Sequence, residues 1–208
     1  GSFFNSGQSC CGIERIYVDE KIFNSFLELF ISKTYNYKLG NPLEQENNLG
    51  PVVKLSAAEF IINQMNKALD KGAKKMIDEN KFHFPKEHKN YLVPQILTNV
   101  THEMDFMTEE TFGPCVGIMK VSDENEAVKL MNDSPYGLTA SIWTNDVEIA
   151  EKIGNQVQTG TFFMNRCDYL DPALSWTGVK ETGKGCSLSE IAYEKLTAPK
   201  SFHLRKGQ

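Results

Sequence analysis

The sequence lacks the cysteine and histidine spacings that mark a disulfide scaffold or a zinc site. Its five cysteines are an odd number, none forms a CxxC pair, and its four histidines do not cluster. We therefore predict no metal site and no disulfide framework. Scattered free thiols fit a reducing compartment, so we expect a cytoplasmic protein, with a mitochondrial location as the alternative.

Long apolar runs and an excess of positive charge are also absent. No run approaches the roughly 20 apolar residues that cross a bilayer, so no membrane span is expected. The formal net charge is -5, with acids and bases mixed along the chain, which argues against nucleic acid as the main partner. With 40% hydrophobic and 24% charged residues in 208, the composition is that of a globular protein with its own core.

A glycine-rich GxGxxG turn between a strand and a helix, the mark of a dinucleotide-binding unit, is missing as well. The chain starts at Gly1-Ser2-Phe3-Phe4 with no strand or helix pattern before it. We interpret this start as a truncation, with the Gly-Ser pair as a cloning remnant, and keep a natural boundary as the alternative.

Helical and strand patterns alternate along most of the chain. Apolar residues three and four apart predict a helix over 21–35 that buries Ile22, Phe23, Phe26 and Phe30. A capping-box pattern, Ser56 to Glu59, predicts a second helix ending at Gly72 and burying Phe60, Ile61, Met65, Ala68 and Leu69. Further helices are expected at 124–132 and 146–156, and strands at 15–18, 74–77, 116–121, 139–143 and 161–165.

This alternation predicts an α/β fold, a single domain with a mostly parallel sheet flanked by helices. The polar stretch 78–90 is expected to be exposed. Because Pro94 interrupts 91–100, we expect an edge or irregular strand there. A long loop should follow Asn165, then a second capping box at 187–190, a helix to about 196 and an extended tail.

Cys10 stands at the end of a turn made of small residues, directly before a predicted strand. Ser6, Gly7 and Ser9 keep the backbone tight around it. Such a turn can aim backbone N–H groups at the oxygen of a carbonyl under attack. A cysteine thiol suits that attack because a few per cent is thiolate near neutral pH. From the turn alone, a buried, inert cysteine is the commoner interpretation.

The segment from Phe3 to Cys10, continued by Arg15-Ile16-Tyr17-Val18, closely resembles the cysteine active-site signature of the aldehyde dehydrogenase superfamily. The resemblance implies that Cys10 is the nucleophile and Cys11 a structural neighbour. Glu109-Glu110-Thr111-Phe112-Gly113-Pro114 resembles the family's second motif. It implies that Glu110 accepts from the nicotinamide ribose hydroxyls and that Phe112 packs beside the nicotinamide of NAD or NADP.

Three weaker matches extend the resemblance over nearly the whole chain. They are Leu49-Gly50-Pro51, the segment from Asn132 to Tyr136-Gly137-Leu138, and the closing loop with Asn165, Gly178, Lys180, Gly183 and Gly185. The closing loop departs from the family, which often has Gly-Gly before the lysine. Phe4, Asp168, Tyr169 and Trp176 correspond to walls of the aldehyde tunnel; Tyr169 and Trp176 are equally open to a simple packing role.

The resemblance implies the reaction. Cys10 would add to a small aldehyde, hydride would pass to the nicotinamide, and an activated water would hydrolyse the thioester. The implied base, the oxyanion asparagine and the cofactor-binding half lie upstream in the family, so we expect residues 1–199 to be the catalytic domain alone and inactive by itself. Residues 200–208 would be an oligomerisation tail of a homodimer or homotetramer.

Other functions stay open from the residues. A coenzyme A-dependent, acylating aldehyde dehydrogenase would use the same cysteine. A cysteine hydrolase would pair Cys10 with a histidine, but the nearest in sequence, His83, lies in a polar stretch without a base motif. A non-catalytic relative would not need Cys10, Glu110 and Phe112 together.

Overall fold

The computed structural model describes residues 1–84 and 87–207, and its centre is a four-stranded sheet. The strand order is β1–β4–β3–β2, with β1 at Arg15–Asp19, β4 at Cys115–Val121, β3 at Gln95–Thr98 and β2 at Lys74–Lys75. β4 runs parallel to both β1 and β3, and β2 is antiparallel to β3. This pairing confirms the predicted α/β fold with a mostly parallel sheet.

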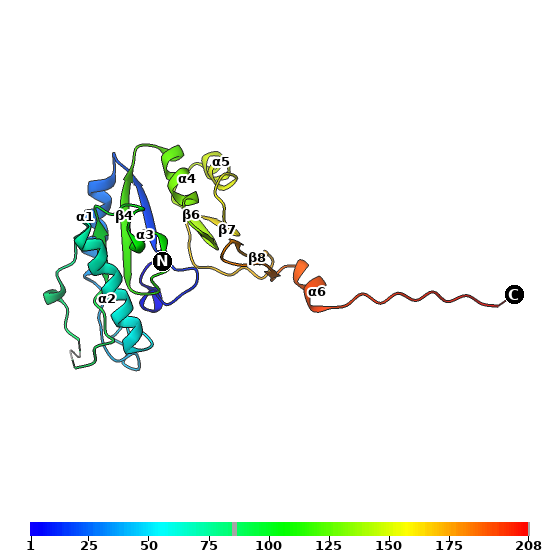
Figure 1. Ribbon diagram of the computed structural model, residues 1–208, viewed down its shortest axis with the longest axis horizontal. Coiled ribbons are helices and arrows are strands. Elements are labelled where there is room, and N and C mark those ends of the chain that lie inside the picture. The colour runs from blue at the N-terminus through cyan, green and yellow to red at the C-terminus, as the bar shows by residue number, and fades with distance from the viewer. Residues whose placement is uncertain (85–86, 208) are drawn as a thin grey trace.

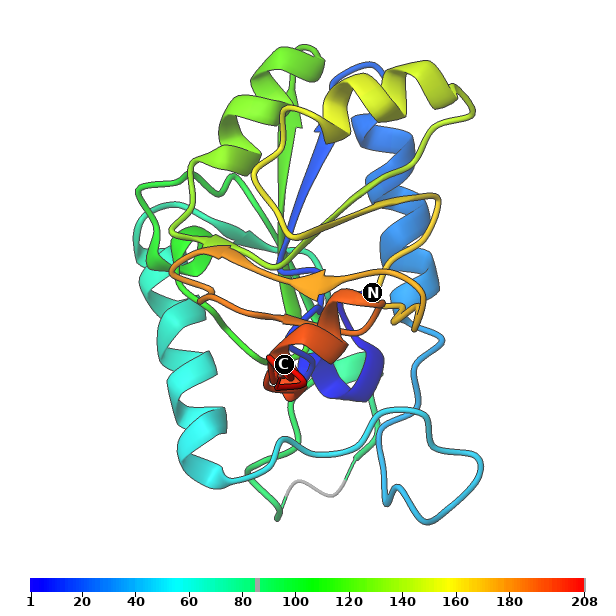
Figure 2. The ribbon, with the colours of Figure 1, turned by 90° about the vertical axis from the view of Figure 1, so that its right-hand side faces the viewer.

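Helices cover both faces of this sheet, because neighbouring strand residues point to opposite sides. Ile96 of β3 belongs to a core under α1, Phe23–Thr34, whereas Leu97 belongs to a core under α2, Leu55–Asp70. The short helix α3, Asp105–Thr108, packs beside α2. Figure 2 shows α1 and α2 on opposite sides of β1 and β4.

A glycine ends α2, as the sequence predicts. Gly72 has φ +101°, its N–H donates to the Leu69 carbonyl, and the Ala73 N–H donates to the Ala68 carbonyl. This pair of bonds is the Schellman arrangement, which satisfies the last carbonyls of a helix. The turn directs the chain into β2.

A smaller layer follows β4. Helices α4, Glu124–Asn132, and α5, Val147–Gly154, pack on the parallel pair of β6, Thr139–Ile142, and β7, Thr161–Met164. Asp123 and Asp146 cap the two helices with side-chain carboxylates. These helices and strands confirm the predicted alternation to within three residues at each end.

The remaining elements are short. They are the 3₁₀ turns η1, Phe4–Gly7, and η2, Glu79–Lys81; the pair of β5, Tyr136–Gly137, with β9, Val179–Lys180; the pair of β8, Trp176–Thr177, with β10, Cys186–Ser187; and α6, Ile191–Leu196. Figure 1 shows the tail after α6 extending away from the rest of the molecule. The predicted polar stretch 78–90 and tail 200–208 include Pro85, Lys86 and Gln208, which lie outside the described residues.

The expectation of an edge or irregular strand around Pro94 is wrong. β3 lies between β4 and β2, and its four residues are all buried. Pro94 stands just before the first strand residue, so its missing N–H removes no bond from the ladder. An interior position is therefore compatible with this proline.

Both predicted capping boxes are wrong. α2 begins at Leu55 with Lys54 as its N-cap, so Ser56 already lies inside the helix; α6 begins only at Ile191.

Two predicted core residues are exposed, Ile22 by 55% and Phe60 by 53%. Ile22 is the N-cap residue of α1, before its first turn, and Phe60 lies on the side of α2 that faces the hollow beside α3. Over residues 1–84 and 87–207 the structure has no helix long and apolar enough to span a membrane.

Candidate active site

The two strongest motifs meet because each precedes one of two neighbouring parallel strands. Arg15 of β1 pairs with Gly117 of β4. The segments that enter these strands therefore lie at the same edge of the sheet. One segment carries Cys10 and the other carries Glu110 and Phe112.

The turn before Cys10 has an unusual backbone. Asn5, Ser6 and Gly7 have φ angles of +49°, +58° and +72°, three left-handed residues in succession. Such residues cost free energy and persist only where the surroundings fix them. The buried Ser6 hydroxyl donates to the Gly50 carbonyl over 2.7 Å, which ties this turn to the Gly-Pro segment.

Gln8 makes the second link to that segment. Its side-chain amide nitrogen donates to the Asn5 and Pro51 carbonyls over 3.1 and 3.3 Å, and its side-chain oxygen accepts from the Val53 N–H over 2.7 Å. All these partners are backbone groups. Gln8 therefore braces the turn and contributes no reactive group.

Gly7 locks the turn against the second motif. A Cβ added to Gly7 would lie 2.0 Å from the Gly113 carbonyl oxygen, so no side chain fits there. Gly113 in turn presses on Ile61 of α2, whose Cδ1 would lie 2.6 Å from an added Cβ. The glycines are needed because two backbones and a helix approach closely.

Cys10 is exposed at the end of this turn, whereas Cys11 beside it is buried. Within the described residues the Cys10 backbone N–H donates to no acceptor. Exposure is what an attacking thiol needs, and a free N–H beside it is available to an oxyanion. The position agrees with that of the predicted nucleophile.

Cys11 joins the turn to the loop after β7. Its thiol donates to the Asp168 carboxylate over 2.7 Å, and Ser9 Oγ lies 3.4 Å from the same sulfur. Burial and the Asp168 bond raise the pKa of Cys11 to about 12. Its thiol therefore stays protonated at neutral pH, in agreement with a structural role.

Glu110 and Phe112 are both exposed, as a contact with a cofactor requires. Phe112 is 40% exposed and has φ +53°, a left-handed conformation that is uncommon for an aromatic residue. Partial burial raises the pKa of Tyr136, and the carboxylates of Glu109 and Glu110 add to this rise. These carboxylates therefore favour the protonated form of the Tyr136 hydroxyl.

Glu14 belongs to this site, although the sequence pattern does not point to it. Its carboxylate accepts from the backbone N–H groups of Thr111 and Phe112, all at 3.0 Å. Burial raises the pKa of Glu14, and the two N–H groups counteract the rise. A carboxylate at the start of a strand is usually solvated by water. The role of Glu14 therefore becomes visible only in the structure, through its bonds to Thr111 and Phe112, which lie 97 and 98 residues further along the chain.

The expected tunnel residues are only partly brought together. Asp168 is tied to Cys11, and the neighbouring Tyr169 ring lies 3.2 Å from the Arg166 guanidinium carbon. Phe4 is 67% exposed in η1. Trp176 is half-buried in β8, where it pairs with Ser187. Asp168 thus lies beside the Cys10 turn, whereas no hydrogen bond joins Trp176 to that turn among the described residues.

The weaker motifs hold the smaller layer together. The Lys180 ammonium donates to the Asn132 and Ser134 carbonyls over 2.7 and 2.9 Å, and the Asn132 side chain bridges to Gln156 and Gln158. These bonds connect the closing loop to the end of α4. Their role is structural.

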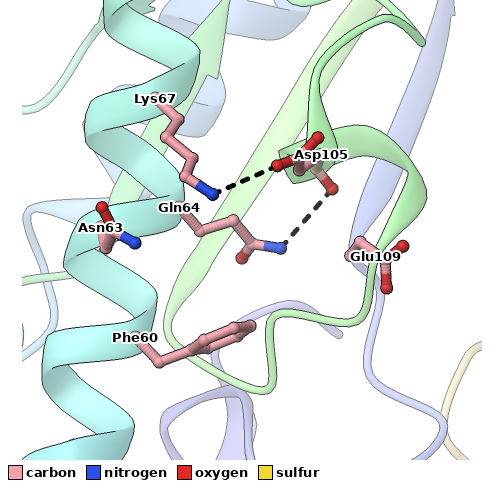
Figure 3. Close-up of a pocket in the computed structure, with 6 residues that line it drawn as sticks. All are labelled: Phe60, Asn63, Gln64, Lys67, Asp105 and Glu109. Carbon is pink, nitrogen blue, oxygen red and sulfur yellow. Dashed lines mark hydrogen bonds and ion pairs between the residues drawn. The ribbon is translucent and has the colours of Figure 1, made fainter.

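A hollow of about 380 Å³ lies between α2 and α3, lined by Phe60, Asn63, Gln64, Lys67, Asp105 and Glu109. Figure 3 shows Lys67 and Gln64 reaching from α2 to Asp105. None of the predicted site residues lines it, although Glu109 precedes Glu110. The polar residues Gln64 and Lys67 in its lining serve to join α2 to α3 through Asp105.

The histidines give no support to a cysteine hydrolase. His102 lies between Tyr17 and Asp133, 2.8 Å from an oxygen of each, and is occupied there. His83 and His88 are exposed in the 78–90 stretch. In the described part of the chain no histidine bonds to Cys10, and no group of three acidic, histidine or cysteine residues could hold a metal ion.

Comparison with known proteins decides the family. The family model described as "Aldehyde dehydrogenase family" matches residues 1–202. This chain belongs to the aldehyde dehydrogenase family. The resemblance seen in the sequence is thereby confirmed, and the aldehyde dehydrogenase fold explains why the two motifs converge.

Individual relatives agree. An aldehyde dehydrogenase of Emericella nidulans is 34% identical over 210 residues, 100% of this chain and 41% of the relative. Succinate semialdehyde dehydrogenase [NAD(P)+] of Escherichia coli is 34% identical over 196 residues, 94% of this chain and 42% of the relative. The chain thus spans about two fifths of the aldehyde dehydrogenases that it matches.

A solved structure shows the same fold. Betaine aldehyde dehydrogenase of Staphylococcus aureus, in complex with NAD+, is 28% identical with a TM-score of 0.85. The match covers 92% of this chain and 38% of that one. The α/β arrangement described above is therefore that of the corresponding part of an aldehyde dehydrogenase.

Proposed function

We propose that this chain is the nucleophile-bearing part of an NAD- or NADP-dependent enzyme that oxidises an aldehyde to a carboxylic acid. One observation carries the proposal: the exposed Cys10 and the exposed Glu110 and Phe112 lie on segments that enter neighbouring parallel strands and are locked together through Gly7 and Gly113. Cys10 is the proposed nucleophile, and Glu110 and Phe112 are the proposed cofactor contacts.

The chemistry of Cys10 follows from its setting. Its sulfur adds to the aldehyde carbon and forms a thiohemiacetal, while the free Cys10 N–H donates to the oxygen that becomes negative. Loss of hydride converts this adduct to a thioester, which water then hydrolyses. The family's water-activating glutamate and second oxyanion donor are proposed for the remaining part of the full-length protein.

The residues present fit a nicotinamide cofactor. Glu110 offers an exposed carboxylate that can accept from vicinal ribose hydroxyls, and Phe112 offers a flat apolar surface for a ring. Bound NAD or NADP would accept the hydride. The relatives span both cofactors, since one is named for NAD(P)+ and another is solved with NAD+.

The experiment compares the 208-residue chain with the full-length protein that contains it. Each is assayed with an aldehyde panel and both cofactors, with and without coenzyme A, following reduced nicotinamide. We expect turnover to the acid only with the full-length protein, and alkylation of Cys10 by iodoacetamide in both. Turnover by the pure 208-residue chain would contradict the proposal that the remaining catalytic groups lie in the rest of the full-length protein. A strict need for coenzyme A would indicate the acylating reaction instead.

We also propose residues 1–199 as the catalytic domain and 200–208 as a tail that extends the sheet of a second copy in a homodimer or homotetramer. Phe202 and Leu204 support this proposal, because they alternate with polar residues and are 71% and 87% exposed. Truncation before Lys200 should lower the mass found by sedimentation of the full-length protein. An unchanged mass would refute the role of the tail.

A cytoplasmic or other reducing location is part of the proposal. All five cysteines are free, and they are separated among four regions of the chain. Fractionation of cells that express the full-length protein would test it.

A further inference from the structure

We infer that Glu14 is a positioning residue that holds the Glu110–Phe112 segment in the conformation that receives the nicotinamide cofactor. The inference rests on the proposed function, because it assigns a purpose to the same site. It starts from three bonds: Glu14 Oε1 accepts from the Thr111 and Phe112 N–H groups, and Oε2 accepts from Thr111, each at 3.0 Å.

Burying the charged Glu14 carboxylate at this position costs free energy. Burial raises its pKa, with the charge of Glu110 acting in the same direction, while the charge of Arg15 and the two N–H groups oppose it. Within residues 1–84 and 87–207 Glu14 forms no ion pair. Its charge is therefore stabilised mainly by the backbone that it binds, and the dependence is mutual.

The bound backbone is itself strained. Phe112 has φ +53°, and its side chain is 40% exposed instead of being packed in a core. A strained conformation persists only when neighbouring groups determine it. Core packing does not do so here, because Phe112 belongs to none of the apolar cores of the described residues. The Glu14 bonds to two successive N–H groups, those of Thr111 and Phe112, hold the backbone that leads into this conformation.

The same peptide is confined from the other side. Gly7 leaves no space beside the Gly113 carbonyl, at 2.0 Å from an added Cβ. The segment thus lies between Glu14 and the turn that ends in Cys10, four residues before Glu14. Glu14 therefore sets the position of the ring surface relative to the sulfur, and a shift of about 1 Å in such geometry is costly to a transfer between bound partners.

The test uses the full-length protein with Glu14→Ala and Glu14→Gln, and Glu126→Gln as the matched control. Glu126 also accepts a backbone N–H, that of Ser122, but lies at the start of α4. Five quantities are measured: the cofactor Kd by titration, for NAD and for NADP; the KM for cofactor; the kinetic isotope effect with aldehyde deuterated at C1; the iodoacetamide alkylation rate of Cys10; and Tm.

For Glu14→Ala we expect Kd and KM for the cofactor to rise about tenfold, as for loss of charge-assisted bonds that orient a binding surface. The alkylation rate of Cys10 should stay within about twofold, since the turn keeps its bonds to residues 50–53. The kinetic isotope effect with aldehyde deuterated at C1 should increase, because hydride transfer slows. Glu14→Gln, which retains one acceptor oxygen, should recover part of the loss, and Glu126→Gln should match wild type.

Two results would overturn the inference. One is a cofactor Kd unchanged in Glu14→Ala while Tm falls, which would make Glu14 a structural residue only. The other is a parallel fall in Cys10 alkylation, which would place its effect on the nucleophile. Kd is measured without an aldehyde, so it tests the role of Glu14 even if the wild-type protein binds cofactor but oxidises no aldehyde, a result that would refute only the proposed function. A wild-type protein that binds neither NAD nor NADP would refute both the proposed function and the role of Glu14.

Discussion

The first 121 residues and the last 50 described residues are built differently. Residues 1–121 form the central sheet and two apolar cores, one on each face. From residue 158 to residue 207 no residue is buried, and the strands there are pairs of two to four residues. The site's backbone belongs almost entirely to the first region.

This difference shows which region can hold a reactive geometry alone. The Cys10 turn and the 111–114 segment enter strands that the cores hold, so a strained backbone can persist there. The last region offers Asp168 and Tyr169 from the loop after β7 and Trp176 from the two-residue strand β8, and none of the three belongs to an apolar core. A region without buried residues is expected to pack against other parts of a longer protein. The relatives, which are more than twice as long as this chain, agree with that expectation.

The largest expected effect tests the nucleophile. Cys10→Ser in the full-length protein should lower kcat for aldehyde oxidation by about 10³-fold or more, because a hydroxyl without a base is a poor nucleophile. The matched change Cys186→Ser, in the last region, should leave the rate unchanged. Initial rates with saturating cofactor measure both. Residual activity above a tenth of wild type in Cys10→Ser, a rough threshold, would remove Cys10 from its proposed role.

Hydrogen exchange tests the comparison directly. Amides of β1, β3 and β4 should exchange at least about 100-fold more slowly than those of β8, β9 and β10 in the 208-residue chain, because opening the latter exposes little buried surface. Exchange is followed by mass spectrometry after pepsin digestion. Equal protection in both regions would show that the last region is stable without further cover.

Three glycine substitutions sharpen the comparison. Gly7→Ala should lower the free energy of unfolding by about 2–3 kcal/mol, because a Cβ meets the Gly113 carbonyl between two rigid segments. Gly160→Ala also meets a carbonyl, that of Thr177, yet should cost less than about 1 kcal/mol, since the short strands there can shift.

Gly72→Ala is the control for backbone strain alone, because no atom lies within 4 Å of an added Cβ at φ +101°. It should cost about 1 kcal/mol. Urea denaturation measures all three glycine variants. If Gly7→Ala costs no more than Gly72→Ala, the close approach at Gly113 does not hold the site.

The smallest expected effect is a pH dependence from Cys11. Its pKa is 9.0 for an ordinary thiol and about 12 in the folded chain. Above pH 9 the unfolded chain releases this proton while the folded chain keeps it, so the free energy of unfolding should fall as pH rises from 9 toward 12. Cys11→Ala should show a shallower fall between pH 8 and pH 10. Identical slopes would mean that neither burial nor the Asp168 bond keeps the Cys11 thiol protonated in the folded chain.

Sequence periodicity predicted most elements, because spacing of apolar residues depends on local geometry. Prediction from periodicity failed where one local sequence pattern is compatible with two structures. Ser56 to Glu59 has the residues of a capping box, but the N-cap is Lys54, two residues before Ser56, so Ser56 already lies inside the helix. Pro94 favours an edge strand, but its place just before β3 permits an interior one.

The candidate site divides in the same way. Cys10, Glu110 and Phe112 could be named from motifs, whose residue types suit the chemistry. Glu14 could not, because a carboxylate at the start of a strand has the same local pattern whether water or a distant backbone solvates it.

The sequence by itself determined the family, the order of helices and strands, and the residues that carry reactive groups, since these follow from local spacing and side-chain type. Only the tertiary structure decided that Glu14 meets Thr111 and Phe112, that Gly7 meets Gly113, and that Cys11 meets Asp168. Those contacts join segments about 100 or more residues apart. Parallel pairing of β1 with β4 creates the first two, and no local pattern encodes which strands become neighbours.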